Sequence, residues 1–475
     1  MKRLIISVCL MVSSVMPAYA ADHFPANPRT MKFPELNFQI PKAERVVLDC
    51  GMPVYLLRDT ELPIINMTAM VRAGSVYEPA EKTGLAAMAG SVMRSGGAGG
   101  IMPEALDDEL EFMASAIESG IGSDMGTVSL TALKKNFSRT LQIFSKILFH
   151  PDFNEKRVEI DRKQLIEELR RQNDDPKEIA GRELNQAIYV GHPLGEVPTF
   201  ESAVSITRKD LVDFHGRYFR IDNMILSVSG DFDRTELLSE LNATFKSATG
   251  LSHLVLPDIP EPNQQFNAEI LYGNKDVSQT VIRMGHLGLT KDSPDIYAVR
   301  LLDYILGGSF TSRLMMEIRT NKGLTYNVNS RFDIGRRFTG TFIAETETKA
   351  ESTVKVINLM NRIISDMTRE PVSAAELSAA SEYMINSFMF AFTTPASIVT
   401  QRARLEYYGY PADYLEKYRD NIAKVSAADI LKAARKHLHP DALKLVVIGN
   451  AAKFDQPLST LGKVRELNLK LNIPK

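Results

Sequence analysis

The residues best suited to chemistry in this chain of 475 residues are an arginine and a tyrosine seven positions apart, Arg319 and Tyr326. Gly323 is predicted to end the helix that contains Arg319, and a β-favouring run begins at Tyr326. We therefore expect the pair at a helix-to-strand corner, which can project two side chains into a cleft. A guanidinium and a phenol placed there can donate hydrogen bonds to a developing oxyanion.

The histidines offer no comparable site. Five of them have no ligand-like spacing to each other or to a cysteine: His150, His192, His215, His253 and His286. His437 and His439 form an H-x-H at a predicted helix end, where imidazoles near the last carbonyls are commonly structural. The sequence also lacks a G-x-S-x-G motif and a phosphate-binding glycine motif.

A second segment of interest is the stretch TGLAAMAGSVMRSGG, residues 83–97. Gly84 can start a helix there, apolar residues recur at core-facing spacing, and Gly96 with Gly97 can stop it. The pattern predicts a short buried helix with almost no polar residues. It is followed by a predicted helix over DDELEFMASAIES, residues 107–119, and a predicted strand over GTVSLTAL, residues 126–133.

The helix at residues 83–97 and the segment before it resemble the pitrilysin/insulinase-type zinc peptidases, the inverzincins. Seven residues carry the family pattern G-S-x-x-E-P-x-x-x-x-G-L-A: Gly74, Ser75, Glu78, Pro79, Gly84, Leu85 and Ala86. The family continues with H-x-x-E-H, in which two imidazoles one turn apart hold zinc and the carboxylate activates its bound water. This chain has Ala87, Gly90 and Ser91 at those three positions, so its zinc motif is degenerate.

The family's third zinc ligand is a glutamate 77 positions after the second histidine, which corresponds to Glu168 here. One leftover carboxylate cannot hold zinc. Glu168, with Glu167 and Arg171 beside it, is also typical of the polar face of an amphipathic helix. We therefore expect no metal or other cofactor to be bound by this chain.

The resemblance extends to a glycine-rich loop and the Arg/Tyr pair. The matching positions are Gly307, Gly308, Ser309, Ser312, Arg313, Leu314, Arg319, Gly323, Leu324 and Tyr326. In the family the loop lies over the substrate channel, and the Arg and Tyr reach an active site across an interface. The resemblance thus implies substrate binding by Gly307, Gly308 and Ser309, and a catalytic role in trans for the pair. Taken singly, the pair would be a surface cation and an edge-strand aromatic.

The chain is predicted to be an internal duplication. A shift of 219 residues superposes seven pairs: Pro176/Pro395, Ile179/Ile398, Tyr189/Tyr408, Thr207/Ser426, Asp210/Asp429, Asp222/Asp441 and Gly230/Gly449. Strands and helices occur in clusters rather than in strict alternation, which favours an α+β fold. The resemblance implies two homologous domains in a clam-shell arrangement, each a mixed β-sheet with helices packed on one face.

The domain boundaries follow from composition. Residues 1–20 have the basic start, apolar middle and small-x-small end of a signal peptide, and residues 21–42 form an arm rich in proline and asparagine. A Pro-rich, polar and exposed linker at 251–266 separates a first peptidase-like domain, 43–250, from a second, 267–475. The signal predicts a periplasmic protein, or a secreted one if the source is not Gram-negative. The mature chain would keep only Cys50, so no internal disulfide is expected.

Charge and hydropathy exclude other function classes. The formal net charge is -2 without a long basic run, which gives no reason to expect nucleic acid or an anionic membrane as a partner. No apolar run after the signal is long enough to span a bilayer.

Three functions remain open. The first is the non-catalytic subunit of a heteromeric zinc metalloendopeptidase, similar to the half-size bacterial members that resemble mitochondrial processing peptidase subunits. A homologous partner with an intact H-x-x-E-H would carry the zinc, and proteolysis of peptides or unfolded segments would require both chains. The second is a catalytically inert scaffold or binding protein of the same fold. The third is an independent hydrolase with other ligands, for which no ligand cluster is visible.

Overall fold

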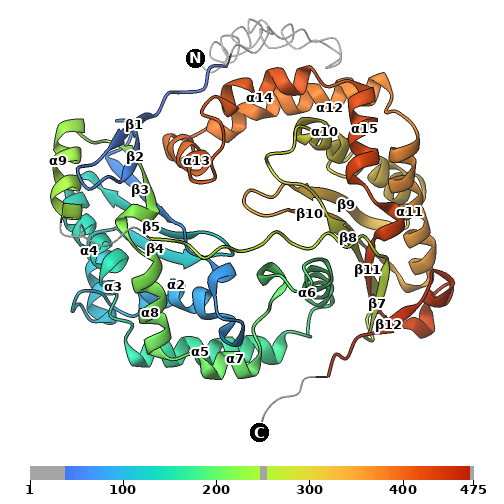
Figure 1. Ribbon diagram of the computed structural model, residues 1–475, viewed down its shortest axis with the longest axis horizontal. Helices are drawn as coiled ribbons and strands as arrows, with labels where there is room; N and C mark the ends of the chain where they lie inside the picture. Colours follow the sequence, from blue (N-terminus) through green and yellow to red (C-terminus); the bar gives the residue numbers. More distant parts are fainter. Residues whose placement is uncertain (1–37, 247–253, 471–475) are drawn as a thin grey trace, which may run out of the picture. The chain divides into compact units, whose positions relative to one another are not determined.

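The computed structural model describes residues 38–246 and 254–470 (Figure 1). The described residues from Ile40 onward form one compact unit. The predicted signal peptide and most of the predicted arm lie outside the described residues. Two six-stranded sheets organise the compact unit, one from each half of the chain.

The first sheet has the strand order β1-β2-β6-β3-β5-β4. Its strands are β1 (Glu44–Val47), β2 (Pro53–Arg58), β3 (Ile64–Val71), β4 (Ala116–Ile121), β5 (Gly126–Leu133) and β6 (Met224–Gly230). β2 and β6 pair in parallel, and the other neighbours pair antiparallel. β6 is buried along its whole length, as expected for a central strand of uninterrupted apolar and small residues.

The second sheet repeats this topology in the order β12-β7-β11-β8-β10-β9. Its strands are β7 (Glu269–Asn274), β8 (Gln279–Leu287), β9 (Thr325–Asp333), β10 (Thr341–Lys349), β11 (Lys444–Gly449) and β12 (Val464–Glu466). β11 pairs in parallel with β7 and antiparallel with β8, as β6 does with β2 and β3. The two sheets differ at one edge, where β12 runs parallel to its neighbour and β1 runs antiparallel. The predicted α+β fold with two mixed sheets is confirmed.

The 219-residue repeat is visible in the helices. α6 (Pro176–Ile188) and α13 (Pro395–Tyr407) both have 13 residues and begin at proline. α8 (Arg208–Tyr218) and α15 (Ala427–His437) both have 11 residues and begin with a capping box. Proline fits the first helical position because its missing N–H has no partner there in any case. Local sequence signals thus place the same helices in both halves.

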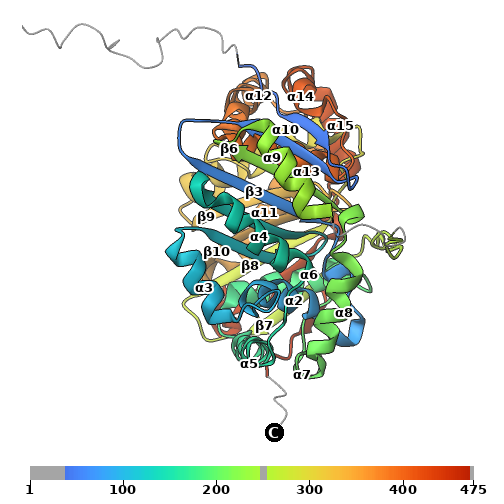
Figure 2. The same ribbon diagram turned by 90° about the vertical axis from the view of Figure 1, so that its left-hand side faces the viewer.

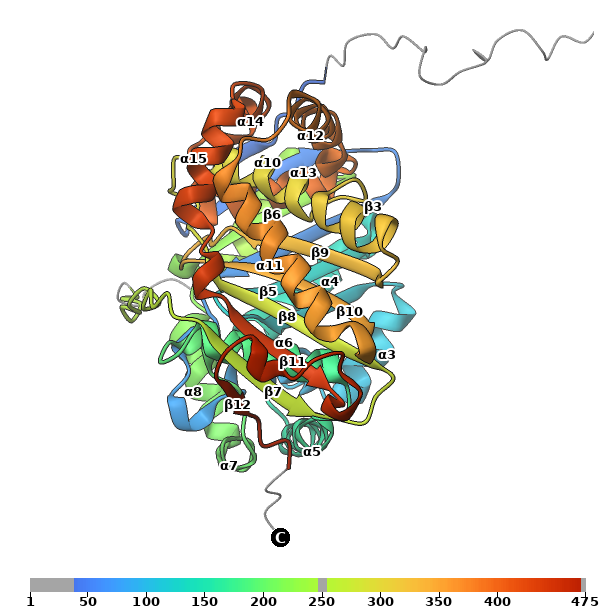
Figure 3. The ribbon, with the colours of Figure 1, turned by 90° about the vertical axis from the view of Figure 1, so that its right-hand side faces the viewer.

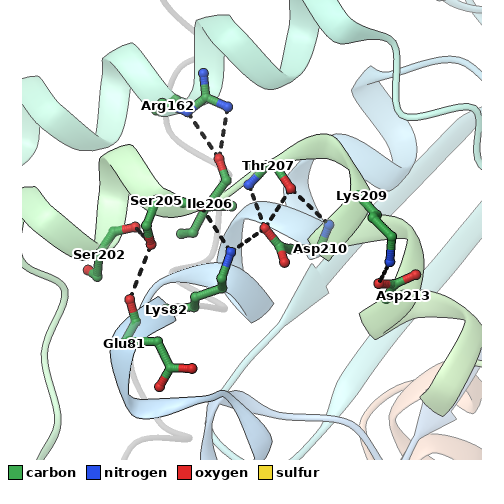
Figure 4. Close-up of polar contacts among 10 residues, drawn as sticks. All are labelled: Glu81, Lys82, Arg162, Ser202, Ser205, Ile206, Thr207, Lys209, Asp210 and Asp213. Carbon is green, nitrogen blue, oxygen red and sulfur yellow. Dashed lines mark hydrogen bonds and ion pairs between the residues drawn. The ribbon is translucent and has the colours of Figure 1, made fainter.

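The capping box of α8 also anchors the segment before the degenerate helix (Figure 4). Asp210 Oδ2 accepts hydrogen bonds from the backbone N (2.7 Å) and the hydroxyl (2.6 Å) of Thr207. Lys82 Nζ donates hydrogen bonds to the same oxygen at 2.5 Å and to Ser205 O at 2.9 Å. Arg162 donates to Ile206 O at 2.9 Å. Residues 205–207 therefore tie α8 to two other segments of the first half.

Each sheet is covered on one face by helices of its own half. The first half contributes α2 (Leu85–Ser95), α3 (Pro103–Phe112), α4 (Phe137–Phe149), α5 (Glu155–Arg171), α7 (Phe200–Ser205), α8 and α9 (Arg234–Phe245). The second contributes α10 (Ile296–Leu306), α11 (Thr353–Arg369), α12 (Ala374–Ser387), α14 (Tyr414–Ala423) and α15. Figure 2 shows α4 and α9 in front of the first sheet, and Figure 3 shows α10, α11 and α15 in front of the second. A separate hydrophobic core lies under each helical layer.

The halves also exchange one helix each. α6 packs on β8 and β11 of the second sheet, where Ile179 and Leu184 are buried against Leu271 and Val446. α13 packs on β2, β3 and β6 of the first sheet, where Ala403 and Tyr407 meet Met70 and Ile225. The prediction of helices on one face is therefore incomplete, since the second face of each sheet receives a helix from the other half.

One predicted element is wrong in part. The helix expected over residues 107–119 ends at Phe112, and Ala116–Ile121 is the edge strand β4. Ala114 has a left-handed backbone (φ 47), which interrupts the helix. Ile117 is buried opposite Leu130 of β5, so pairing with β5 overrides the helical period of the sequence.

The linker segment is held more firmly than its composition predicts. Leu254, Leu256 and Ile259 pack against the first core, and Glu261 accepts hydrogen bonds at 2.9 Å from both the N–H and the hydroxyl of Thr339. Cys50 is half-buried and carries a free thiol. No helix in the described part of the chain is both long and apolar enough to cross a membrane.

Candidate functional site

The retained part of the zinc-peptidase pattern holds the start of α2. Glu78 accepts hydrogen bonds from the backbone N–H groups of Gly84 (2.9 Å) and Ala86 (2.5 Å), so its carboxylate caps the helix. Gly84 has φ +100, which favours glycine. Burial raises the pKa of Glu78 to about 7, although the two N–H donors oppose this. A Cβ at Gly74 would lie 2.2 Å from Ser123 O, so this glycine allows a close backbone contact.

The degenerate motif itself lies on α2, which is the short buried helix predicted from the sequence. Ala87 and Ser91 are exposed, one turn apart, and Gly90 is buried between them. A Cβ at Gly90 would lie 2.5 Å from Ile121 N and 2.9 Å from the Gly120 carbonyl carbon, both backbone atoms of β4. The space for a side chain at the family's glutamate position is therefore closed by the neighbouring strand.

The helix α5 packs on α2 and carries two acidic residues near the degenerate motif. Glu168, the predicted leftover ligand position, is exposed and accepts a hydrogen bond from Gln164 Nε2 at 3.1 Å. Asp161 is hydrogen-bonded to the Ser91 side chain, and burial, with a smaller effect of the Glu168 charge, raises its pKa. We missed Asp161 in the sequence, although it precedes Glu168 by two helical turns and so shares its face.

This donor set does not fit zinc. One hydroxyl and two carboxylates lack the imidazoles that catalytic zinc sites use. Among residues 38–246 and 254–470, no group of three or more His, Cys, Asp and Glu side chains is placed to hold a metal ion.

The histidine beside α2 is not free to replace the missing ligands. His192 and Ala87 both line a cavity of about 390 Å³ at the start of α2. His192 Nδ1 accepts from Leu194 N at 3.1 Å, and Nε2 lies 3.0 Å from Pro260 O. Burial lowers the pKa of His192, so the ring is held neutral between two backbone partners.

The glycine-rich loop follows α10 and packs on β9. Gly307 is buried, and a Cβ there would lie 2.3 Å from Ser330 N, so only glycine allows the helix end to approach the strand. Gly308 is exposed and Ser309 half-buried, with the Ser309 hydroxyl 3.3 Å from the Thr311 hydroxyl. The loop is accessible at Gly308 and Ser309, as a binding loop must be.

The next helical turn is anchored by a bidentate ion pair. Arg313 Nε lies 2.7 Å from Glu376 Oε1, and Arg313 Nη2 lies 3.0 Å from Oε2. This hydrogen bonding lowers the pKa of Glu376 to about 2.

The Arg/Tyr pair sits at the predicted helix-to-strand corner. Arg319 belongs to the π-helical segment Met315–Asn321, and such segments often occur at functional sites. Gly323 turns the chain with φ +61, and Tyr326 is the second residue of β9. Arg319 Cζ lies 5.4 Å from the centre of the Tyr326 ring, within cation–π range. Tyr326 is 83% exposed, so its phenol faces solvent.

The structure brings Arg319 and Tyr326 together but does not join them to α2. α2 packs on β4, the edge strand of the first sheet, and the pair lies at β9, the equivalent edge of the second. Within the described residues, no hydrogen bond or ion pair connects Arg319 or Tyr326 with α2. A single chain thus presents the pair apart from the degenerate motif.

Two models of one peptidase family match most of this chain. The model described as Insulinase (Peptidase family M16) matches residues 54–198, and the model described as Peptidase M16 inactive domain matches residues 205–384. The chain belongs to the M16 peptidase family. The degenerate motif lies in the first matched region, and the Arg/Tyr pair lies in the second.

Individual M16 relatives extend over nearly the full length. A Helicobacter pylori protein named Non-peptidase homolog YmxG is 23% identical over 411 residues, covering 85% of this chain and 93% of the relative. The crystal structure of a peptidase M16 inactive domain from Pseudomonas fluorescens has a TM-score of 0.80 at 24% identity, covering 88% of this chain and 100% of that one. A protease from Helicobacter pylori has a TM-score of 0.78 at 18% identity, covering 86% and 100%.

Proposed function

We propose that this chain is the substrate-binding and transition-state-stabilising subunit of a heteromeric periplasmic zinc metalloendopeptidase, in which a homologous partner carries the H-x-x-E-H motif. One observation carries the proposal. The first half lacks the two imidazoles, and its position for the water-activating carboxylate, Gly90, is closed by β4. Arg319 and Tyr326 contact each other, with Arg319 half-buried and Tyr326 exposed to solvent. The Helicobacter pylori relative named a non-peptidase homolog agrees with a chain that is not catalytic alone.

The chemistry divides between the two chains. Zinc in the partner would activate the attacking water. In this chain, the Tyr326 hydroxyl and the Arg319 guanidinium donate hydrogen bonds to the oxyanion that develops as water adds to the peptide carbonyl. Their mutual cation–π contact at 5.4 Å orients both donors before substrate binds, so little ordering is needed during the reaction.

The substrate would be an extended peptide or an unfolded segment. Gly308 and Ser309 are accessible, and the loop has backbone N–H groups that can pair with a peptide main chain. Gly307 keeps the loop close to β9, and Arg313 with Glu376 fixes the helical turn behind it. We assign substrate binding to Gly307, Gly308 and Ser309.

The test is a reconstituted complex with the H-x-x-E-H partner. Tyr326→Phe removes one donor and should lower kcat for an unstructured peptide roughly 10²-fold, and Arg319→Ala should do likewise. Arg369→Ala is the matched control, because the Arg369 side chain is 70% exposed on α11, outside the site. Gel filtration reports assembly separately, since the substitutions leave the apolar contacts between subunits in place.

The second candidate is an inert scaffold or binding protein of the same fold. The closed position at Gly90 and the name of the Helicobacter pylori relative are equally compatible with it. A double variant, Tyr326→Phe with Arg319→Ala, that still assembles and keeps full peptidase activity would refute the role in trans and favour the scaffold.

A further inference from the structure

A cavity of about 810 Å³ is lined mainly by residues of the second half, and no residue of α2 contributes to its walls. Its walls come mainly from α13, α14 and the end of β9, while α10 contributes Arg300 and the β4–β5 turn contributes Asp124. Arg319 and Tyr326 are not among its lining residues. The function of this cavity is therefore a separate question from the peptidase role.

Three arginines line the cavity, and none forms an ion pair in the described residues: Arg300, Arg336 and Arg404. The Nε atoms of Arg300 and Arg404 are buried without a hydrogen-bond partner. A buried donor without a partner is costly, and a charged one more so. Each guanidinium group thus keeps one buried N–H without an acceptor, although Arg300 also has a side-chain hydrogen bond with Tyr414.

The two aspartates that line the cavity are already engaged. Asp124 Oδ1 accepts a hydrogen bond from the Tyr408 hydroxyl at 3.1 Å, and Asp333 Oδ2 accepts from Arg331 Nε at 3.1 Å. Arg336 lies over the Tyr408 ring, 5.4 Å from its centre. The three arginines and two aspartates of the lining give a formal excess of one positive charge.

The remaining walls are largely aromatic. Tyr410 and Tyr414 have ring centres 4.7 Å apart, Tyr414 and Tyr418 6.3 Å, and Phe388 stacks on Tyr418 at 4.8 Å. Arg300 Cζ lies 5.9 Å from the centre of the Tyr418 ring, so the cation adjoins these faces. Aromatic faces bind apolar and aromatic groups, and the adjoining guanidinium groups bind a carboxylate.

We propose that this cavity binds a peptide segment in which a carboxylate stands next to an aromatic side chain. The carboxylate accepts hydrogen bonds from Arg300 and Arg404, and the aromatic side chain packs against Tyr414 and Tyr418. The volume is that of a small-ligand site, which accommodates a few residues. This binding does not depend on the proposed peptidase role.

Three tripeptides with an acetylated N-terminus, titrated calorimetrically into the full chain, test the proposal and identify the source of the carboxylate. They are acetyl-Phe-Glu-Phe-amide, acetyl-Phe-Gln-Phe-amide and acetyl-Phe-Gln-Phe with a free C-terminus. We expect at least one of the two carboxylate peptides to bind at least tenfold more tightly than the uncharged one, equivalent to about 1.4 kcal/mol. A preference for the first identifies an acidic side chain, and a preference for the third identifies a C-terminus.

Variants locate the binding. Arg404→Gln should weaken the preferred peptide at least tenfold, and Arg300→Gln should act in the same direction. Arg402→Gln is the matched control, because Arg402 lies on the same helix but pairs with Glu416 and does not line the cavity. Thermal unfolding checks the fold of each variant. If Arg300→Gln does not fold, the affinities of the wild-type chain for the three peptides and the affinity of Arg404→Gln still test the proposal. Equal affinity for all three peptides, no binding at millimolar concentration, or an Arg404→Gln affinity equal to wild type would overturn the proposal.

Discussion

At the edge of the first sheet, β4 approaches α2 so closely that a Cβ at Gly90 would lie 2.5 Å from a backbone nitrogen. At the equivalent edge of the second sheet, β9 begins beside an open corner where Tyr326 is 83% exposed. The five strands from β2 to β4 and from β7 to β9 have the same order and pairing directions in the two sheets, so the difference does not come from the topology of these edges. At Gly307 the second edge is approached just as closely, since a Cβ there would lie 2.3 Å from Ser330 N, so the accessible part of that edge is the corner where β9 begins.

The comparison also explains which residues of the family pattern remain. Glu78 caps α2, Gly84 supplies a left-handed turn and Gly74 allows a close backbone contact, so all three serve the backbone. The positions that would only serve zinc are Ala87, Gly90 and Ser91.

The largest effect is expected at the closed edge. Gly90→Glu places a side chain against the β4 backbone and should lower the free energy of unfolding by about 3 kcal/mol or more, through overpacking and carboxylate burial. Denaturant unfolding measures it. Zinc analysis of the triple variant with Ala87→His and Ser91→His should show no stoichiometric metal. A stable triple variant that holds one zinc per chain would contradict the closure of this edge.

Gly216 is the matched control for Gly90. It lies in α8 with nothing within 4 Å of an added Cβ. Gly216→Ala should therefore raise the free energy of unfolding by about 0.5–1 kcal/mol, because alanine loses less conformational freedom in a helix. Equal costs for alanine at Gly90 and at Gly216 would show that the β4 contact is not what restricts Gly90.

The second prediction concerns the pH dependence of stability and uses one carboxyl from each half, Glu78 and Asp303. Burial raises the pKa of Glu78 to about 7 and that of Asp303 to about 7, from ordinary values of 4.5 and 3.8. Between these values and pH 7 the native state keeps a proton that the unfolded chain releases. The contribution of each carboxyl to stability therefore decreases as pH rises, by roughly 1–3 kcal/mol.

Paired variants separate this effect from other titrating groups. Glu78→Gln and Asp303→Asn should each reduce the decline in unfolding free energy between pH 5 and pH 7.5 relative to wild type. The buried histidines act in the opposite direction, since burial lowers the pKa of both His215 and His286 to about 4, but they are common to all variants. Curves parallel to wild type would show that neither carboxyl is protonated in the native state at neutral pH.

The third prediction compares the exchanged helices. The Tyr407 hydroxyl of α13 donates to Asp124 O at 2.7 Å and lies 3.2 Å from Val71 O. Tyr407→Phe leaves these buried carbonyls without that donor and should cost about 1–2 kcal/mol. The position 219 residues earlier is Ile188 of α6, an apolar contact, and Ile188→Val should cost about 0.5–1.5 kcal/mol. A Tyr407→Phe variant as stable as wild type would show that α13 is held by packing alone.

Much of this fold could be predicted because its signals are local. Proline at the first position of α6 and α13, and the capping boxes at Thr207 and Ser426, define helix starts by hydrogen bonds a few residues away. β4 could not be predicted in the same way, because its pairing with β5 and its contact with Gly90 are tertiary. The exchange of α6 and α13 is also tertiary, because each helix packs on strands of the other half of the chain.

The candidate site shows the same division. The helix-to-strand corner followed from Gly323 and from the β-favouring run at Tyr326. The absence of H-x-x-E-H at residues 87–91 also followed directly from the sequence. Asp161 next to Ser91, and Arg300 and Arg404 in the cavity of the second half, were not found, because only the packing of helices shows which polar atoms are buried together.

The smallest effect is expected at Glu168, the position that the family resemblance aligns with a third zinc ligand. It is exposed, and its carboxylate receives one hydrogen bond, from Gln164 on the same helix. Glu168→Ala should change the free energy of unfolding by no more than about 0.5 kcal/mol, as for surface substitutions elsewhere. Metal analysis after dialysis should give the same zinc content for wild type and variant, because two carboxylates and a hydroxyl do not form a zinc site. The contrary result is about one zinc per wild-type chain that is lost in Glu168→Ala but kept in the neighbouring control Glu167→Ala. It would show that the first edge still binds metal, and the contrast between the two edges would disappear.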